Sequence, residues 1–149
     1  MYDGFSKRFL LIDDDTDDRA LFSEALATVD PVAICDHATD GAEAFDRLYR
    51  KELAEPDIIF LDINMPVMNG WQFLRKLKSE EAYKHIPVIV YSTSSSQRDR
   101  RTADDLGALC FITKPDAFRV LRAMLGVVVG HVRKRSFDAI CPELKALSA

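Results

Sequence analysis

The sequence places acidic, hydroxyl and lysine side chains at the ends of four separate apolar runs. An acidic triplet, Asp13–Asp15, follows the first run, and Asp62, Ser92 and Lys114 come at the ends of later ones. Crowded carboxylates repel one another until a divalent cation joins them, and an all-oxygen ligand set suits Mg²⁺. A lysine and a hydroxyl facing the same point add donors for phosphate oxygens. If the four runs end at one edge of a sheet, these residues predict a pocket for a phosphoryl group beside Mg²⁺.

The apolar runs themselves are typical of buried β-strands, because each is short, continuous and rich in β-branched or aromatic residues. Five of them recur along the chain: Phe9–Ile12, Val32–Cys35, Ile58–Leu61, Val88–Tyr91 and Leu109–Ile112. Stretches with helical spacing separate the runs, so strand and helix alternate. Such alternation predicts a parallel sheet with helices on both faces. We therefore expect an α/β fold with a doubly wound, five-stranded parallel sheet.

Apolar stripes at helical spacing mark the connecting helices. The first three stripes are Leu21, Phe22, Ala25, Leu26 and Val29; Ala42, Phe45, Leu48 and Tyr49; and Trp71, Phe73, Leu74 and Leu77. Asp40 is the expected N-cap of the second helix, and the fourth helix, Gln97–Asp105, is weakly apolar and should pack loosely. Pro31 opens the second predicted strand. A proline is tolerated best at a sheet edge, where the strand order 2-1-3-4-5 would place it.

The length of the chain allows one domain and a short extension. A chain of 149 residues falls near the usual size of a single domain, and we assign that domain to residues 7–130. Residues 131–149 form a tail in which Pro142 is expected to be the first residue of a closing helix. We expect no output domain.

The last helix of the domain, expected over Asp116–Arg133, is apolar on more than one face. Its second stripe consists of Val120, Met124 and Val127. A second apolar stripe needs a second partner. Two partners are equally consistent with the sequence: another copy of the chain, giving a homodimer, or the tail residues Phe137, Ile140 and Leu144.

Composition and charge argue against several classes of protein. The formal net charge of −4 is the wrong sign for a general nucleic-acid binder. No apolar stretch approaches the ~20 residues of a membrane helix, and Met1–Phe5 has neither the charge nor the apolar segment of a secretory signal. Cys35, Cys110 and Cys141 lack paired or metal-type spacing and are expected to be reduced thiols. We expect a cytoplasmic protein that binds neither nucleic acid nor membranes.

Asp62 is the candidate for the group that receives the phosphoryl. It follows the apolar run Ile58–Leu61 and precedes a loop that ends in the turn pair Asn69-Gly70. A carboxylate at the end of a buried strand is held rigidly and projects into the pocket, as a nucleophile requires. The acidic triplet is less specific, because Asp15 can equally be the N-cap of the first helix.

Four segments at the predicted strand ends resemble the receiver domain of two-component response regulators. They are FLLIDDD (Phe9–Asp15), IIFLDINMPVMNG (Ile58–Gly70), VIVYSTS (Val88–Ser94) and FITKP (Phe111–Pro115). Four motifs in the same order and at the same separations make the resemblance specific. It spans about residues 7–129 and implies a flavodoxin-like fold, with Asp62 phosphorylated by a sensor histidine kinase or a phosphotransfer protein of a phosphorelay.

The resemblance also implies a role for each site residue. The Mg²⁺ ligands would be Asp14, Asp62 and the backbone carbonyl of Asn64, with Asp13 acting largely through water. Lys114 would pair with the phosphoryl group or with Asp62, and Ser92 would turn to bind the phosphorylated form. Such a protein is a switch that loses its aspartyl phosphate slowly, not a turnover enzyme.

Two features depart from the common receiver pattern. Phe111 stands where many receivers carry a tyrosine whose rotation accompanies the hydroxyl switch. A ring rotation is still available, but a phenolic hydrogen bond is not. The usual acidic pair is here a triplet, so assigning Asp13 and Asp14 assumes a strand that ends at Ile12, whereas a slip of one residue would bring in Asp15.

Three functions compete on the sequence alone. The leading one is a stand-alone response regulator that signals by phosphorylation-dependent protein contacts, which in this family use the fourth helix, fifth strand and fifth helix. Its runs YSTSS and INMPVMNG are similar to single-domain regulators that serve sensor kinases, including phytochrome-type ones. An aspartate-nucleophile phosphatase of the haloacid dehalogenase type is the second, although Asp17 falls where its motif has threonine or valine. The third is a receiver-like binding module without phosphorylation.

Overall fold

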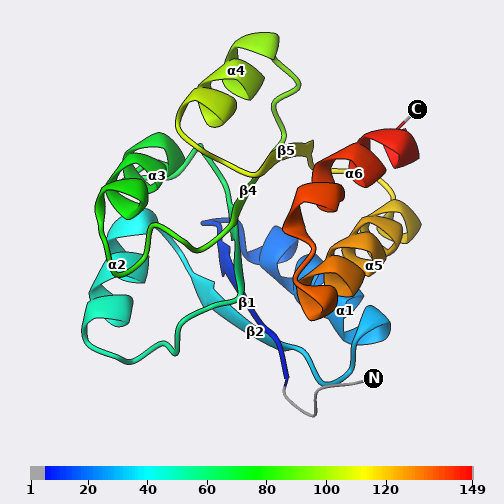
Figure 1. The fold of residues 1–149 in the computed structure, drawn as a ribbon, viewed down its shortest axis with the longest axis horizontal. Coiled ribbons are helices and arrows are strands. Elements are labelled where there is room, and N and C mark those ends of the chain that lie inside the picture. The colour runs from blue at the N-terminus through cyan, green and yellow to red at the C-terminus, as the bar shows by residue number, and fades with distance from the viewer. Residues whose placement is uncertain (1–5, 149) are drawn as a thin grey trace.

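The strands form one parallel sheet in a computed structural model that describes residues 6–148 (Figure 1). They are β1 (Arg8–Ile12), β2 (Ile34–Ala38), β3 (Ile58–Leu61), β4 (Val88–Ser92) and β5 (Cys110–Thr113). Their order is β2-β1-β3-β4-β5, and every neighbouring pair is parallel. The fold class and strand order are therefore confirmed. The prediction that Met1–Phe5 carries no secretory signal lies outside the described residues.

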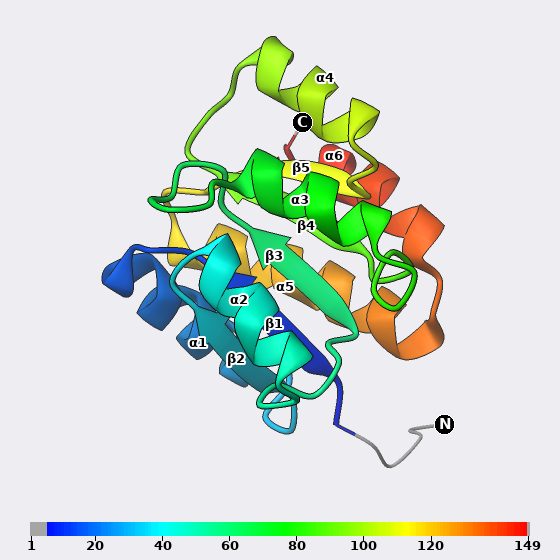
Figure 2. The same cartoon turned by 90° about the vertical axis from the view of Figure 1, so that its left-hand side faces the viewer.

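Helices connect the strands and cover both faces of the sheet. They are α1 (Thr16–Val29), α2 (Gly41–Tyr49), α3 (Gly70–Ser79), α4 (Gln97–Asp105), α5 (Phe118–Lys134), the 3₁₀ helix η1 (Phe137–Ala139) and α6 (Ile140–Ser148). One face carries α2 and α3, with α4 beyond them near the β5 edge, and the other carries α1, α5 and α6 (Figures 1 and 2). Within residues 6–148, no helix is both long and apolar enough to cross a membrane.

The alternation of side chains along the strands divides the core into two halves. Phe9 and Leu11 of β1 pack with α1 and α5, whereas Leu10 and Ile12 pack with α2 and α3. All residues of β3 and β4 are buried. Because helices cover both faces of these central strands, the strands are continuous apolar runs in the sequence.

The second strand begins later than the predicted Val32–Cys35, so that part of the prediction was wrong. The backbone N–H of Asp30 donates to the carbonyl of Leu26 at the end of α1, and the N–H of Ala33 donates back to the carbonyl of Asp30. This turn leaves Pro31 before the strand and Val32 48% exposed. β2 is an edge strand bonded to β1 alone. An edge strand tolerates polar residues, which is why the apolar run did not mark its position.

Two large residues of the predicted helical stripes are exposed. Leu21 of α1 is 47% exposed and Tyr49 of α2 is 49% exposed. α1 buries Phe22, Ala25 and Leu26, so Leu21 falls on the flank of the buried face. The ring of Tyr49 stacks on that of Phe45 at a centroid distance of 5.9 Å and meets the ring of Tyr83 edge-on at 5.8 Å, at the margin of the core.

The tail of the same chain covers Met124, the middle residue of the second apolar stripe of α5, and leaves Val120 and Val127 partly exposed. Ile140 and Leu144 of α6 are almost fully buried, in one cluster with Met124. Met124 is therefore only 7% exposed. Of the two partners that the sequence left open, the tail occupies this place. α6 begins at Ile140, two residues before the predicted Pro142, because η1 leads directly into it.

The fourth helix is loosely packed, as its sequence predicted. α4 runs from Gln97 to Asp105, and its buried residue is Ala103. Ser96 caps its first turn by accepting a hydrogen bond from the N–H of Asp99. A helix held by so little apolar area can move at low cost.

Candidate functional site

The carboxyl end of β1 supplies the first part of the site. The strand ends at Ile12, and the buried Asp13 carboxylate accepts a hydrogen bond of 2.9 Å from the N–H of Asp15. Asp15 in turn caps α1 by accepting from the N–H of Asp18. Asp14 lies between them and is exposed. The strand therefore ends where the assignment of Asp13 and Asp14 required.

The carboxyl end of β3 places Asp62 beside them. Its N–H donates to the carbonyl of Ile12 at 2.9 Å, and its Oδ1 accepts from the N–H of Ile63 at 2.8 Å and of Asn64 at 3.4 Å. The side chain is 9% exposed. Backbone N–H groups thus hold Oδ1 of Asp62, while the side chain still reaches solvent. A group that reacts with a phosphoryl donor as large as a protein must be accessible in this way.

The loop after Asp62 returns close to the strand end at Gly70. The N–H of Gly70 donates to the carbonyl of Ile63 at 3.2 Å. A Cβ atom at Gly70 would lie 2.3 Å from the carbonyl oxygen of Asp62, closer than any real contact. Gly70 is therefore required by a close backbone approach, and α3 begins there with the capping box of Asn69 and Gln72.

The three carboxylates fit a divalent cation. Asp13, Asp14 and Asp62 each offer an oxygen, and these oxygens all lie within 4.8 Å of one another. Hard oxygen donors of this kind suit Mg²⁺, which keeps several waters and completes its shell with phosphate oxygens. These three side chains would hold the ion. Asn64, whose carbonyl the resemblance adds, is an exposed residue of the same loop.

Lys114, just beyond β5, crosses the site from the opposite side. Its Nζ lies 2.7 Å from Oδ2 of Asp13, 2.7 Å from Oδ2 of Asp18 and 3.9 Å from Oδ2 of Asp62. Asp62 is therefore the most distant of its three acidic partners. The sequence analysis missed Asp18. Its position three residues after the N-cap Asp15, in the turn of α1 nearest the site, was the signal that could have found it.

Burial and charge shift the pKa values of both groups. Burial raises the pKa of Asp62 to about 6, against the opposing effect of Lys114, and Asp13 adds to the rise. For Lys114, burial alone would lower the pKa, but hydrogen bonds to Asp13 and Asp18 raise it above its ordinary value. Lys114 is therefore a permanent cation, while the pKa of Asp62 depends first on burial and then on its charged neighbours.

Ser92, the last residue of β4, is fully buried at the edge of the site. Its Oγ accepts a hydrogen bond of 3.1 Å from the N–H of Ser94, so its own hydroxyl proton remains available to donate. Ser94 continues the loop, donating through its Oγ to Oδ2 of Asp99 at 2.6 Å. The predicted hydroxyl thus lies at the expected strand end, tied to the loop that leads into α4.

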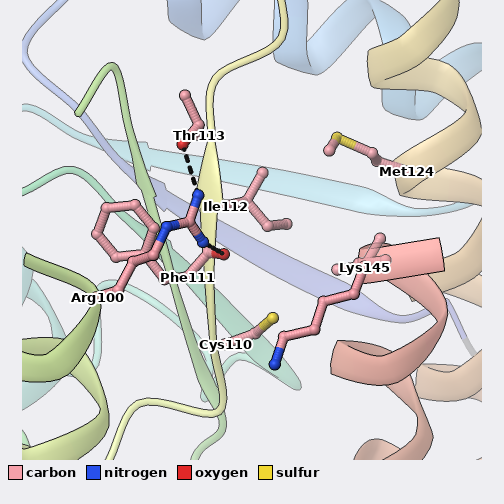
Figure 3. Close-up of a pocket in the computed structure, with 8 residues that line it drawn as sticks. Arg100, Cys110, Phe111, Ile112, Thr113, Met124 and Lys145 are labelled. Atoms are coloured by element: carbon pink, nitrogen blue, oxygen red, sulfur yellow. Dashed lines mark hydrogen bonds between the residues drawn. The ribbon is translucent and has the colours of Figure 1, made fainter. Parts of the chain in front are cut away.

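Phe111 lies beside α4 and is partly buried. The guanidinium carbon of Arg100 lies 4.9 Å from the centre of the Phe111 ring, and Nη2 of Arg100 donates to Oγ1 of Thr113 at 3.1 Å (Figure 3). Thr113 Oγ1 donates in turn to the carbonyl of Ser94 at 2.9 Å. The ring predicted to rotate therefore lies under an arginine, which the sequence analysis did not anticipate.

The predicted contact stripe does not reach the phosphoryl site. Val120 and Val127 are partly exposed, and Met124 is buried under α6.

The three cysteines are free thiols. Cys110 of β5 lies against Cys141 of α6, where burial and a hydrogen bond between the two thiols raise the pKa of Cys110 to about 12. A contact between residues this far apart in sequence follows from the packing of α6 alone.

Comparison with known proteins identifies the family. Residues 9–126 match the response regulator receiver domain, and the chain belongs to this family. Chemotaxis protein CheY1 of Helicobacter pylori is 30% identical over 123 residues, which cover 83% of this chain and 97% of that protein. Receiver domains are the switches of two-component signalling, and they bind Mg²⁺ at an acidic pocket. The phosphatase alternative therefore has no support.

Other relatives are much longer than this chain. The protein-glutamate methylesterase/protein-glutamine glutaminase of Bacillus subtilis is 37% identical over 110 residues, which cover 72% of this chain and 29% of that protein. The corresponding protein of Treponema denticola is 38% identical over 110 residues, or 28% of its length. The chain spans less than a third of these two relatives, so the activity in their name does not transfer to it.

Solved structures agree with the family assignment. The phosphorylated cyanobacterial phytochrome response regulator RcpA superposes with a TM-score of 0.78 and 31% identity, covering 85% of this chain and 94% of that one. The Mn²⁺-bound form of response regulator Rcp1 gives a TM-score of 0.76 and 27% identity, covering 86% and 95% of the two chains. Both similarities extend over nearly the whole receiver fold.

Proposed function

We propose that Asp62 is the phosphoacceptor of this receiver and that the protein signals by phosphorylation-dependent contacts with another protein. One observation carries the proposal: a carboxylate held by two backbone N–H groups lies between two further carboxylates and the ammonium of Lys114. This arrangement provides a nucleophile, a cation site and a positive charge for phosphate oxygens at one point. A module that only binds a partner would not need a nucleophile, a cation site and a buried ammonium at one point.

The transfer exchanges one bond for another. A carboxylate oxygen of Asp62 forms a bond to phosphorus while the bond between phosphorus and the donor nitrogen breaks, and its electron pair stays on the donor imidazole. Bound by Asp13, Asp14 and Asp62, Mg²⁺ would supply positive charge against the oxygens of the transferred group. The donor is a sensor histidine kinase or a phosphotransfer protein. Slow hydrolysis of the acyl phosphate then resets the switch.

Lys114 and Ser92 complete the pocket. Lys114 is 3.9 Å from Asp62 Oδ2, so a small shift brings its ammonium to a phosphoryl oxygen. Ser92 keeps a free hydroxyl proton, because its Oγ is an acceptor in its bond with Ser94. Donation of that proton to the phosphoryl group would pull the loop before α4 toward the site. Phe111 of β5 would follow, since its ring lies against Arg100 of α4, the helix that this loop leads into.

The proposal extends to the organisation of the protein. Residues 7–130 act as the receiver and residues 131–149 as an extension that packs on it, and the chain works as a stand-alone regulator in the cytoplasm. The net charge of −4 supports protein partners over nucleic acid. A homodimer through α5 would use Val120 and Val127, which are partly exposed. Met124 would not take part, because it is buried under α6.

Incubation with acetyl phosphate and Mg²⁺, followed by intact mass measurement, tests the proposal. We expect one phosphoryl adduct that is labile to base, absent in Asp62→Asn and retained in Asp46→Asn, which alters an exposed carboxylate of α2. Rapid turnover of small phosphate esters would instead indicate a phosphatase. No adduct and no binding of beryllofluoride, a phosphoryl mimic, would leave a binding module without phosphorylation.

A further inference from the structure

Two thiols meet where α6 packs on β5. Cys110 of β5 belongs to the core cluster on the α5 side of the sheet, Cys141 of α6 packs against that cluster, and a hydrogen bond joins their side chains. Cys110 is 7% exposed, whereas Cys141 is partly exposed. A disulfide requires two cysteine side chains to approach one another closely. The packing of α6 on β5 already brings these two thiols together.

A basic groove runs along β5 between α4 and α6 and gives access to this pair. Two adjoining hollows of about 250 and 340 Å³ form the groove, and they share the lining residues Arg100, Cys110, Phe111 and Lys145. Arg101 and Cys141 line the larger hollow as well. Figure 3 shows Arg100 and Lys145 on opposite sides of β5, with the thiol of Cys110 on the side of Lys145. Cys141 is thus the thiol that a molecule in the groove can reach.

The charge of the groove favours an anionic ligand. Arg100 and Arg101 come from α4, and Lys145 lies one turn after Cys141 on α6. Asp104 is the acidic residue among the described residues that line the two hollows. A cation beside a thiol also favours the thiolate, which is the reactive form. The larger hollow, at about 340 Å³, falls in the range of roughly 300–1,000 Å³ that is usual for small-molecule sites.

The cysteines differ in how they can react. Burial and the hydrogen bond to Cys141 raise the pKa of Cys110 to about 12, so Cys110 stays protonated near neutral pH. Cys141 is more exposed and lines the groove, so it is the thiol that attacks first. Cys35 lies in β2, at the opposite edge of the sheet from β5, and burial raises its pKa to about 12 as well. An accessible thiol beside a buried one is the arrangement in which a disulfide forms stepwise.

We propose that Cys141 and Cys110 form a reversible disulfide site for a small anionic disulfide of the glutathione type. The Cys141 thiolate attacks one sulfur of that molecule, so a mixed disulfide forms and the first small thiolate leaves. Cys110 then loses its proton and bonds to the Cys141 sulfur, while the second small thiolate leaves and takes up a proton. The two protein thiols lose two electrons, and the small disulfide is reduced to two thiols. This inference does not depend on phosphorylation of Asp62.

The new bond would fix α6 on the sheet. In the reduced protein, α6 is held by its buried residues Ile140 and Leu144, and it covers Met124 of α5. A disulfide between β5 and α6 adds a covalent constraint that restricts the unfolded chain. The cover on Met124 would then stay in place until a reductant breaks the bond.

Incubation of the full chain with oxidised glutathione, followed by intact mass measurement and peptide mapping, tests the site. We expect one glutathionyl adduct on Cys141 first, and then its replacement by a disulfide between Cys110 and Cys141. Cys110→Ser should keep the adduct on Cys141, Cys141→Ser should form neither product, and Cys35→Ser should behave as the wild type.

Peptide mapping of the wild-type protein decides the point even if a variant folds poorly. An adduct that forms on Cys35 as fast as on Cys141 would overturn the proposal. So would the absence of any reaction, or an adduct on Cys141 that never gives way to the disulfide with Cys110.

The role of the groove charge is tested with a matched pair of double variants. Arg101→Gln/Lys145→Gln removes two exposed cations of the groove, and Arg50→Gln/Lys84→Gln removes two exposed cations elsewhere. We expect the rate of adduct formation with oxidised glutathione to fall about tenfold in the first variant alone, the size of an electrostatic steering effect. The loss should be smaller with the neutral 2-hydroxyethyl disulfide, for which only the effect of Lys145 on the thiolate remains. An equal loss with both disulfides, or no loss with either, would overturn the selection of an anion.

The effect on α6 is measured by urea denaturation of the oxidised and the reduced protein. We expect the disulfide to raise the urea midpoint, because it restricts the unfolded chain, and dithiothreitol to return the midpoint to its starting value. Cys110→Ser, which keeps only the mixed disulfide, should show no rise. An unchanged or lower midpoint in protein whose mass shows the disulfide would overturn the fixing of α6.

Discussion

The acidic pocket and the basic groove differ in burial as much as in charge. At the pocket, Asp13, Asp62 and Ser92 are buried and held by backbone hydrogen bonds. At the groove, Arg101 and Lys145 are exposed and α4 is held by little apolar contact. Charges act strongly where water is excluded and reach partners only where it is not. The buried strand ends are therefore suited to chemistry, and the exposed cations of the groove are suited to contacts with other molecules.

The comparison predicts that one substitution, glycine to alanine, has very different costs in the two regions. At Gly70, a Cβ would meet backbone atoms of Asp62 and Ile63 at 2.3 and 2.7 Å. We expect Gly70→Ala to cost about 3 kcal/mol or more, the upper end of what overpacking typically costs, and to abolish the adduct. Urea denaturation in EDTA measures the first effect, and intact mass measures the second.

Gly107, in the loop between α4 and β5, is the matched position. Its φ is +90°, but its Cβ would meet only the flexible side chain of Lys78 at 3.8 Å. We expect Gly107→Ala to cost about 1–2 kcal/mol, the penalty of a left-handed backbone alone. A cost at Gly107 equal to that at Gly70 would show that the loop beside the groove is as rigid as the pocket.

The groove wall formed by α6 should depend on its buried anchor. Ile140 is fully buried, whereas Leu147 on the same helix is 45% exposed. Truncation of a buried isoleucine costs about 3 kcal/mol, so Ile140→Ala should lower the free energy of unfolding by that amount. Leu147→Ala should change it by about 0.5 kcal/mol or less. Equal effects of the two would mean that α6 does not dock in solution.

The pocket should destabilise the metal-free protein in a pH-dependent way. The folded pKa of Asp62, about 6, exceeds its ordinary value of 3.8, so the folded state binds the proton more tightly. As far as Asp62 is concerned, the free energy of unfolding is then highest below pH ~4. It falls as the pH rises through 6 and is constant above that. Asp62→Asn should relieve a penalty of about 3 kcal/mol at pH 7.5 and about half of it at pH 5.

Denaturant midpoints of the two proteins in EDTA across this range measure the effect. Mg²⁺ should raise the stability of the wild type and reduce the difference, because bound cation offsets the buried charge. A difference that grew toward low pH would mean that Asp62 is held as a carboxylate by Lys114 and that burial is the weaker influence.

The smallest effect concerns the competition for Lys114. Asp18 Oδ2 lies 2.7 Å from its Nζ, whereas Asp62 Oδ2 lies at 3.9 Å. Asp18→Asn should free the ammonium for a phosphoryl oxygen and tighten beryllofluoride binding about fivefold, the worth of one charge-assisted hydrogen bond. Asp17→Asn, at the exposed neighbour, should have no effect. Weaker binding in Asp18→Asn would mean that Asp18 orients Lys114 productively.

Sequence reasoning predicted most of the fold and fewer of the side-chain contacts around the site. It located β3 and α4 at their observed bounds, and the predicted strand order is the observed one, although Pro31 lies before β2 and not within it. It misplaced β2, because an edge strand does not need a continuous apolar run. Asp18, and the contact of Arg100 with Phe111 and Thr113, were missed. The position of Asp18 in the first turn of α1 could have indicated it, whereas the partners of Arg100 come from another element and no local pattern marks that contact.

The sequence by itself determined the family, the alternation of strand and helix, and the residues at four strand ends, because burial and turn chemistry leave periodic signals in one dimension. Only the tertiary structure decided which acid Lys114 contacts and what covers Met124. It also decided that a basic groove borders β5 on an acidic chain. These outcomes depend on how helices of similar apolar pattern pack against one another, and packing distances of a few ångströms are not encoded in residue spacing.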